Sequence, residues 1–298
     1  MHTRRTPFLP PHRPMGYAPV PVSSQRFGAT IVVPLLDQVD SWLEQSVRSA
    51  LAQTAPCEVI VVYSTRARES NTRLLASLAA EHPGLRIEPE PVQGGFAAAI
   101  NHGIQLASAD RVGLLLSDDW LDPRAVERCL PHQVDIVSTG LTVFLADGRT
   151  PAMAPGAPPS LETFQKRTTL EERARYLKHF FLFRKTAIVE AGGLDESLGD
   201  YPGIDDFDLI WTMLERGATV AIVPASLYNY RDHDGERLTL RDRDQAKRTL
   251  ERILEKHGLR GDEKARVLAI HLPWYGRPVH AAQAEIAAGD ARRRRGLK

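Results

Sequence analysis

The fold is decided by one stretch, RVGLLLSDDWLDP at residues 111–123. Its apolar run predicts a buried strand that ends in two adjacent carboxylates, Asp118 and Asp119. Because α/β sheets bind ligands beyond the carboxyl ends of their strands, we expect both acids at the functional edge. Their oxygens suit Mg²⁺ or Mn²⁺, which take one or two protein carboxylates and leave room for substrate phosphate oxygens. A plainer interpretation is that Asp119 or Asp122 only caps the helix after Pro123.

The chain before this stretch alternates between strand and helix patterns. Apolar, β-branched runs predict strands at 29–36, 58–63, 85–88 and 111–116, and the segments between them predict helices at 42–53, 69–81 and 96–107. Asp40 and Ser41 are the expected N-caps of the first helix. The alternation implies βαβ units, and therefore an α/β fold with a Rossmann-like, mostly parallel central sheet flanked by helices.

The second half of the chain has a less regular pattern. One or two strands are expected at 134–144, broken at Gly140, and a long loop is expected at 146–160, which holds four prolines. The remaining predicted elements are helices at 170–177 and 205–215, a short helix that ends at 192–193, strands at 218–223 and 226–230, and helices beyond 241 with a break near 272–273.

Composition excludes several protein classes. The chain has 298 residues, of which 43% are hydrophobic, and its net charge of +1 is far from that of a disordered chain. No segment reaches the ~18 apolar residues of a membrane span, and no signal peptide is recognisable. Cys57 and Cys129 lie in apolar stretches and make no disulfide framework or metal cluster. These features predict a cytoplasmic protein.

The charge is unevenly distributed along the chain. Residues 1–27 carry four arginines and no acid, residues 291–298 carry five basic residues and no acid, and the body at 28–290 is left with a net charge of −8. An acidic body argues against nucleic acid as a partner. The two basic ends are expected to be solvated tails, with peripheral contact to anionic lipid at the inner membrane face, or to a polyanionic acceptor, as the alternative.

Three further segments carry chemistry. Asp205 and Asp206 open an amphipathic helix, where they serve either as N-terminal anions or as a general base toward a hydroxyl. Arg231 and His233 follow a strand, so they are candidates for a phosphate clamp and a metal ligand, although a lone histidine is more often a surface residue. The small-residue segment around Asn101 is more typical of close helix packing than of a site.

Together, in this order and spacing, these segments resemble the inverting GT-A glycosyltransferases of family 2. The resemblance covers about 29–239 and rests on several coupled motifs. The matching segments are 31–34, 49–54, 95–103, 117–123, 183–185, 192–196, 205–209 and 230–233.

The resemblance implies a role for each matching acid. Asp118 takes the place of the metal-binding carboxylate in the Asp-x-Asp motif of the family, and Asp119 that of a second ligand or ribose contact. Asp206 matches the catalytic base, while Asp205 replaces the glutamate that normally precedes it.

The resemblance also implies a closing loop and donor contacts. Arg231 and His233 belong to a loop that closes over the donor diphosphate, where the histidine reaches the metal. Pro34 and Asn101 lie in matching motifs that are expected to contact the donor.

Two departures from the family pattern fall on the nucleoside side of the donor site. The usual Asp-Asp-Gly-Ser after the second strand, whose acid binds uracil, is here Tyr63-Ser64-Thr65-Arg66, and Leu116 replaces the first aspartate of Asp-x-Asp. Tyr63 can stack on a base and Ser64 can hydrogen-bond its edge, so the identity of the donor nucleotide stays open.

The leading hypothesis is a metal-dependent transfer of a sugar, with inversion, from a nucleotide-diphospho-sugar to a hydroxyl of a glycan, lipid-linked or small-molecule acceptor. The alternative is a catalytically silent relative that binds a glycan or a partner. A nucleotidyltransferase is disfavoured because the first strand is not followed by a glycine-rich phosphate loop.

The expected organisation has three parts. A proline-rich basic arm at 1–27 precedes a GT-A domain at 28–240, whose nucleotide-binding half is 28–130 and whose acceptor half is 131–240. A helical extension with a basic tail follows at 241–298 and could either pack on the body or pair two chains into a homo-oligomer. By the resemblance, the segments 146–175 and 180–184 face the acceptor.

Overall fold

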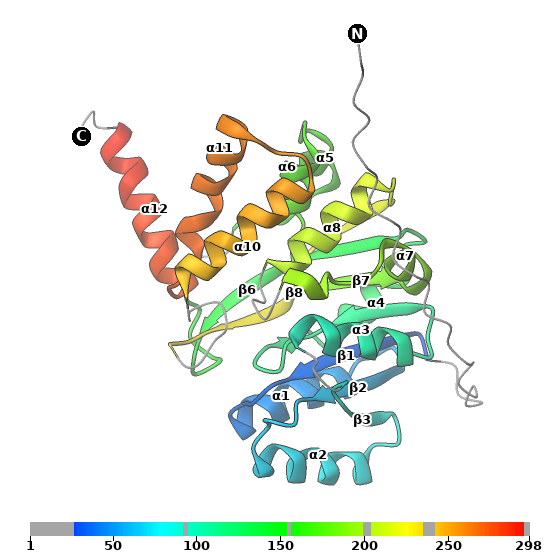
Figure 1. Cartoon of the computed structure of the whole chain (residues 1–298). Helices are drawn as coiled ribbons and strands as arrows, with labels where there is room; N and C mark the ends of the chain where they lie inside the picture. Colours follow the sequence, from blue (N-terminus) through cyan, green and yellow to red (C-terminus); the bar gives the residue numbers. More distant parts are fainter. Residues whose placement is uncertain (1–26, 92–94, 154–155, 199–203, 235–241, 295–298) are drawn as a thin grey trace.

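A computed structural model describes residues 27–91, 95–153, 156–198, 204–234 and 242–294. Within them, one sheet runs in the order β3-β2-β1-β4-β7-β6-β8-β5 (Figure 1). The strands are β1 (Ala29–Leu35), β2 (Cys57–Tyr63), β3 (Leu85–Pro89), β4 (Arg111–Leu114), β5 (Trp120–Leu121), β6 (Ile136–Leu145), β7 (Phe181–Arg184) and β8 (Val220–Asp232).

Helices flank both faces of this sheet. The α-helices are α1 (Asp40–Leu51), α2 (Glu69–Glu81), α3 (Phe96–Leu106), α4 (Ala125–Cys129), α5 (Leu161–Gln165), α6 (Leu170–Tyr176), α7 (Lys185–Ala191), α8 (Asp205–Glu215), α10 (Arg243–Lys256), α11 (Gly261–His271) and α12 (Val279–Arg294). Two short 3₁₀ helices are η1 (Glu196–Leu198) and η2 (Leu272–Trp274).

The N-terminal half forms the parallel part of the sheet, as the sequence predicts. Strand β1 pairs in parallel with β2 and β4, and β2 pairs in parallel with β3. All seven residues of β1 are buried, which explains its unbroken apolar character. The predicted α/β class is therefore confirmed, with helices α1, α2 and α3 within one or two residues of their expected bounds.

The second half adds antiparallel pairs. Strand β7 lies antiparallel between β4 and β6, β6 pairs in parallel with β8, and the short β5 pairs antiparallel with β8. The breaks expected at Gly140 and Pro224 do not interrupt these strands. The β6–β8 register instead shifts around Gly140, and Pro224 falls where β8 carries the extra residues of that irregularity. Proline is tolerated at such a point because it has no amide to donate to a ladder.

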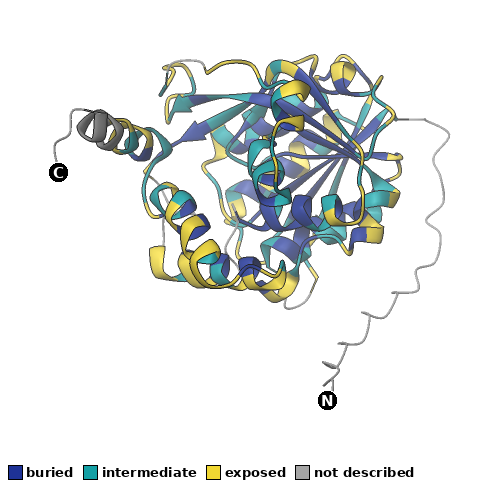
Figure 2. Cartoon of the chain, turned by 90° about the horizontal axis from the view of Figure 1, so that it is seen from above, coloured by how far each residue is buried: buried dark blue, intermediate teal, exposed yellow. Residues whose placement is uncertain are grey.

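Successive residues of β1 serve opposite layers of the core. Ile31 and Val33 pack in the cluster that includes α1 and α2, whereas Val32 packs in the cluster with α3 and α8. Helix α3 approaches closely because Gly103 faces Val32: a Cβ at Gly103 would lie 2.4 Å from a Val32 methyl. Seen from above in Figure 2, the buried strands run beneath a partly exposed shell of helices.

The expected capping of the first helix is wrong. Helix α1 begins at Asp40, its N-cap is Val39, and no side chain caps it. The Asp40 carboxylate instead accepts hydrogen bonds from Ser70 and Asn71 of α2. The hydrogen bonds of Asp40 to α2 are therefore formed in place of a cap on its own helix.

The C-terminal helices dock on α8 through buried charge. Asp208 is 1% exposed and accepts hydrogen bonds from Lys256 Nζ at 2.7 Å and from His257 Nε2 at 3.0 Å. The His257 ring stacks on Trp211 at 4.2 Å. The chain then breaks at η2, as predicted near 272–273. The helices α10, α11 and α12 stand on the side of the molecule opposite α1 and α2 (Figure 1).

Helix α12 is tied to the end of β8. The Asp232 carboxylate accepts hydrogen bonds from the backbone amides of Val279 and His280, the first residues of the helix, at 3.0 and 2.9 Å. Most of the predicted N-terminal arm, residues 1–26, lies outside the described residues, as does 295–298 of the basic tail. No helix of the described chain has the length and apolar character needed to cross a membrane.

We expect Asp208→Asn to lower the free energy of unfolding by about 2 kcal/mol, because it removes the charge that satisfies Lys256 and His257 inside the α8–α10 contact. Urea denaturation followed by circular dichroism measures the change. Glu69→Gln is the matched control, because it breaks an exposed pair with Arg73 and should cost less than about 0.5 kcal/mol. Equal effects of the two substitutions would contradict the docking role of Asp208.

Candidate active site

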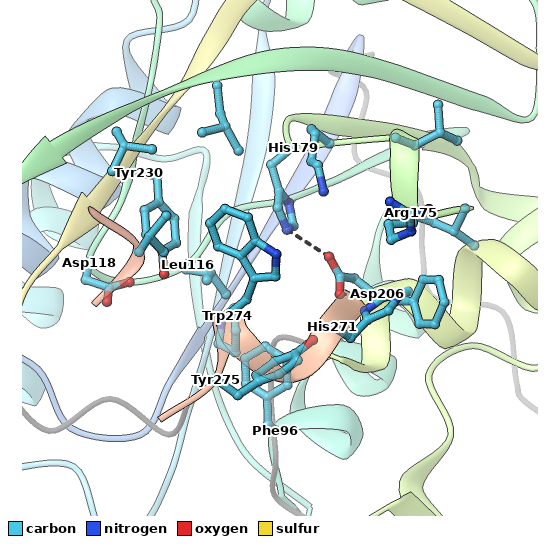
Figure 3. A pocket seen from close by; sticks show the side chains of 18 of the residues that line it. Phe96, Leu116, Asp118, Arg175, His179, Asp206, Tyr230, His271, Trp274 and Tyr275 are labelled. Carbon is cyan, nitrogen blue, oxygen red and sulfur yellow. Dashed lines mark hydrogen bonds and ion pairs between the residues drawn. The ribbon is translucent and has the colours of Figure 1, made fainter. Parts of the chain in front are cut away.

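A cavity of about 1020 Å³ opens where β1, β2 and β4 end. Its walls come from distant parts of the chain: Pro34 and Asp118 from the sheet edge, Asp206 from α8, and Trp274 from the break between α11 and α12. In Figure 3, Trp274 lies between Asp118 on one side and Asp206 on the other. The volume is at the upper end of the range typical of ligand pockets.

Asp118 lies at one end of the cavity, with His233 beside it. His233 Nε2 lies 3.1 Å from Asp118 Oδ2, and the histidine ring packs on Trp42 at 4.5 Å. The two residues are adjacent because β5, two residues after Asp118, pairs with β8, which ends one residue before His233. The structure thus brings together two residues that the sequence assigned to a metal.

Asp119, expected as a second ligand or ribose contact, faces the other way. It is 1% exposed, and its carboxylate accepts hydrogen bonds from the Tyr228 hydroxyl and the Arg231 backbone amide, both at 2.7 Å. Burial, and then the charge of Asp119, raise the pKa of Tyr228 well above its usual value, so the phenol stays a donor. Asp119 does not line the cavity; its two oxygens hold β8 against the loop that carries Asp118.

Arg231, expected to clamp the diphosphate, is also directed into the protein. Its guanidinium donates to the backbone carbonyls of Asp118 and Ala146 and to the Gln45 side chain. It lies between the rings of Trp42 and Trp120, 5.0 and 4.9 Å from their centroids. With 1% of its surface exposed, Arg231 stabilises the Asp118 loop and does not reach the cavity.

Asp206 lies at the far side of the cavity and is paired with His179. Asp206 Oδ2 and His179 Nε2 are 3.0 Å apart, and the Asp206 side chain is 29% exposed (Figure 3). Burial alone would raise the pKa of Asp206, but the hydrogen bond and charge of His179, together with the charge of Lys178, hold it below its usual value. The carboxylate is therefore ionised at neutral pH and can accept a proton.

The His179 ring is held in place by its neighbours. It packs against Phe181 at 4.7 Å and Tyr228 at 5.1 Å, and its Nδ1 is buried without a hydrogen-bond partner among the described residues. The ring therefore presents its Nε2 to Asp206. Sequence reasoning missed His179; the only available signal was a histidine between a predicted helix and an apolar run.

Three other predicted site residues lie off the cavity. Asp205 is buried in the first turn of α8. The Asn101 amide bonds both backbone groups of Leu194, so it fixes a turn. Tyr63 is half-buried and packs with the α1–α2 cluster. None of the three belongs to the described lining.

Pro34 and Ser64 do line the cavity, near the ends of β1 and β2, and a residue not singled out from the sequence joins them. Glu90 follows β3, and its Oε1 accepts a 2.6 Å hydrogen bond from the Ser64 hydroxyl. The signal for Glu90 was present, because it follows a predicted strand at the same sheet edge as Ser64.

Of the two segments expected to face the acceptor, 146–175 and 180–184, only the first contributes to the cavity wall. Residues 180–184 are wrong as a ligand surface: Phe180 and the first three residues of β7 are buried in the core. The loop between β6 and α6 does contribute lining residues, with Arg175 and Lys178 beyond it. Trp274 and Tyr275 complete this wall from the C-terminal extension.

The donor set at Asp118 and His233 fits a divalent cation that binds with few protein ligands. The two donor atoms are close and their side chains are 17% and 4% exposed. Groups of three or more acidic, histidine or cysteine side chains able to hold a metal are absent from the described chain. Mg²⁺ and Mn²⁺ tolerate such a sparse set because phosphate oxygens and water supply the other ligands.

The chain is similar to several known proteins. It is 24% identical over 213 residues to the O-antigen biosynthesis protein RfbC of Myxococcus xanthus, a match that covers 70% of this chain and only 16% of that protein. The chain thus spans about a sixth of the length of this relative.

Solved structures share the fold. S. aureus TarS 1–349 in complex with UDP-GlcNAc superposes with a TM-score of 0.61 at 16% identity, covering 82% of this chain and 71% of that one. The mannosyltransferase PcManGT from Pyrobaculum calidifontis, in complex with GDP-Man and Mn²⁺, gives a TM-score of 0.54 at 17% identity, covering 91% and 77%.

Residues 30–191 match the family model described as "Glycosyl transferase family 2". The matched region contains Asp118, His179 and most of the residues that line the cavity, and it ends before α8, which carries Asp206. Because it spans more than half of the chain, and because the expected sheet is present, the protein belongs to glycosyl transferase family 2.

Proposed function

We propose that this protein transfers a sugar from a nucleotide-diphospho-sugar to an acceptor hydroxyl, with a divalent cation and with inversion at the anomeric carbon. One observation carries the proposal: Asp118, which pairs with His233, lines the same cavity as the Asp206–His179 pair. The nucleotide-sugars bound by the structural neighbours, UDP-GlcNAc and GDP-Man, support a donor of this class.

The first pair would hold the cation, Mn²⁺ or Mg²⁺. When bound, the cation supplies positive charge to a leaving diphosphate. Asp118 offers a carboxylate oxygen and His233 an imidazole nitrogen, and the surrounding chain keeps both in place: Arg231 bonds the Asp118 carbonyl, and Trp42 packs on the His233 ring. Such fixed groups stabilise developing charge without reorganising during the reaction.

The second pair would serve the attacking hydroxyl. The Asp206 carboxylate is ionised, partly exposed to the cavity and oriented by His179, so it can take the proton of an acceptor hydroxyl. Asp118 and Asp206 line the cavity from different elements (Figure 3). With the donor diphosphate at Asp118 and the hydroxyl at Asp206, the hydroxyl would meet the sugar on the face away from its diphosphate. Attack from that face inverts the anomeric carbon.

Asp118→Asn should abolish the Mn²⁺-dependent gain in nucleoside diphosphate binding, a loss of about tenfold or more in affinity, because it removes the anionic ligand. Titration calorimetry with UDP and GDP, with and without Mn²⁺, measures it.

The neighbouring substitution Asp119→Asn is the matched comparison. It should lower the free energy of unfolding by about 2 kcal/mol, because it weakens the acceptor of Tyr228 and Arg231, whereas Asp118→Asn should leave stability nearly unchanged. Mn²⁺-dependent binding that persists in Asp118→Asn would refute the metal assignment.

Asp206→Asn should keep nucleotide binding and lower kcat for donor turnover about 10²- to 10⁴-fold, the usual contribution of a general base. Slow hydrolysis of the best-binding nucleotide-sugar, with water as acceptor, provides the assay. Glu190→Gln, an exposed change on α7, is the control. Wild-type kcat in Asp206→Asn would remove this residue from the reaction.

His179→Gln should lower kcat about tenfold with KM nearly unchanged, because it loosens the orientation of Asp206 without touching the donor end. The same hydrolysis assay separates kcat from KM. A rise in KM at constant kcat would instead show that His179 acts in substrate binding.

A further inference from the structure

The end of the cavity beside Ser64, where the nucleoside of the proposed donor would lie, has an unexpected carboxylate. The acid that family members carry after the second strand is absent here, where the residues are Tyr63-Ser64-Thr65-Arg66. Glu90, from the neighbouring strand, points its carboxylate to the same place: Oε1 accepts hydrogen bonds from the Ser64 hydroxyl at 2.6 Å and the Thr65 amide at 3.3 Å. The acid has thus moved from the end of β2 to the end of β3.

The position of Glu90 is fixed by its backbone. It lies between Pro89 and Pro91, and a residue that precedes proline is confined to extended conformations. Its amide donates to the Tyr63 carbonyl at 2.8 Å, which extends the β2–β3 pairing by one residue. Backbone and side chain are therefore both held before any ligand arrives, which reduces the entropy cost of binding.

Glu90 also has an oxygen, Oε2, that can still accept a hydrogen bond from a ligand. Asp37 lines the same end of the cavity, but its two oxygens are engaged by the Arg68 guanidinium at 2.7 and 2.8 Å. Glu90 Oε2, in contrast, receives no hydrogen bond from any residue that the structure describes. An ionised carboxylate only accepts hydrogen bonds, so a ligand bound at this end of the cavity must present hydrogen-bond donors to it.

We propose that Glu90 recognises a guanine base, so that the donor is a guanosine-diphospho-sugar; this inference rests on the glycosyl transfer proposed above. Guanine presents two adjacent donors, N1–H and the N2 amino group, to one carboxylate. Uracil and thymine present a single N–H between two carbonyls, and cytosine and adenine place a ring acceptor beside their amino group. A carboxylate can accept the single N–H of uracil, but only guanine offers two donors side by side, so guanine is the base that matches a carboxylate best.

Inosine diphosphate provides the probe, because it differs from GDP only in lacking the N2 amino group. With the full-length protein and saturating Mn²⁺, calorimetry should give an affinity for GDP at least about tenfold above those for IDP and UDP, the usual value of a hydrogen bond to a charged group. Glu90→Gln should bring GDP to within about threefold of IDP, because an amide offers one acceptor and one donor in place of two acceptors.

Glu88→Gln is the matched control. Glu88 lies on the same strand, pairs with Arg86 and does not line the cavity, so the preference for GDP should persist. UDP binding as tightly as GDP, or an unchanged GDP-to-IDP ratio in Glu90→Gln, overturns the guanine assignment. The role of Asp118 in Mn²⁺-dependent binding survives both results, whereas failure of every nucleotide to bind would overturn the transfer reaction itself.

Discussion

The buried Asp119 carboxylate is the constraint on which the site depends. One oxygen holds the Tyr228 hydroxyl and the other holds the backbone of Arg231, so a single side chain fixes β8 against the loop after β4. The Arg231 guanidinium, which lies between two tryptophan rings, in turn donates a hydrogen bond to the Asp118 carbonyl. These contacts bring Asp118, which lines the cavity, next to His233. Buried polar groups that are fully satisfied in this way make one arrangement much more favourable than its alternatives.

The pairs of neighbouring acids show what the sequence could and could not predict. The four parallel strands, the helices between them and the place of the site all follow from apolar periodicity and strand order. Which acid of each pair lines the cavity does not follow from the sequence. Asp118 and Asp119 are chemically identical, yet one faces the cavity and the other the core; the same holds for Asp206 and Asp205. Adjacent side chains point in different directions, and which of them meets solvent is decided by β8 and the C-terminal helices, which are distant in sequence.

The residues that sequence reasoning missed share a cause. His179, Glu90 and Trp274 come from three separate segments, and none belongs to a motif with a chemical signature of its own. Two of them become significant only through a partner: His179 through Asp206, and Glu90 through Ser64. The opposite error affected Arg231, whose motif suggested a ligand contact although its environment satisfies it internally. Motifs locate a site well, but the contacts of each side chain assign its role.

Asp232 connects the end of β8 with the C-terminal wall of the cavity. It stands between Arg231 and His233, and its carboxylate holds the first amides of α12, close after Trp274 and Tyr275. A C-terminal segment without amides placed for this carboxylate would remove two hydrogen bonds from a buried anion that directly precedes His233. Any redesign of this wall of the cavity therefore requires that β8 and the helices after it be exchanged together.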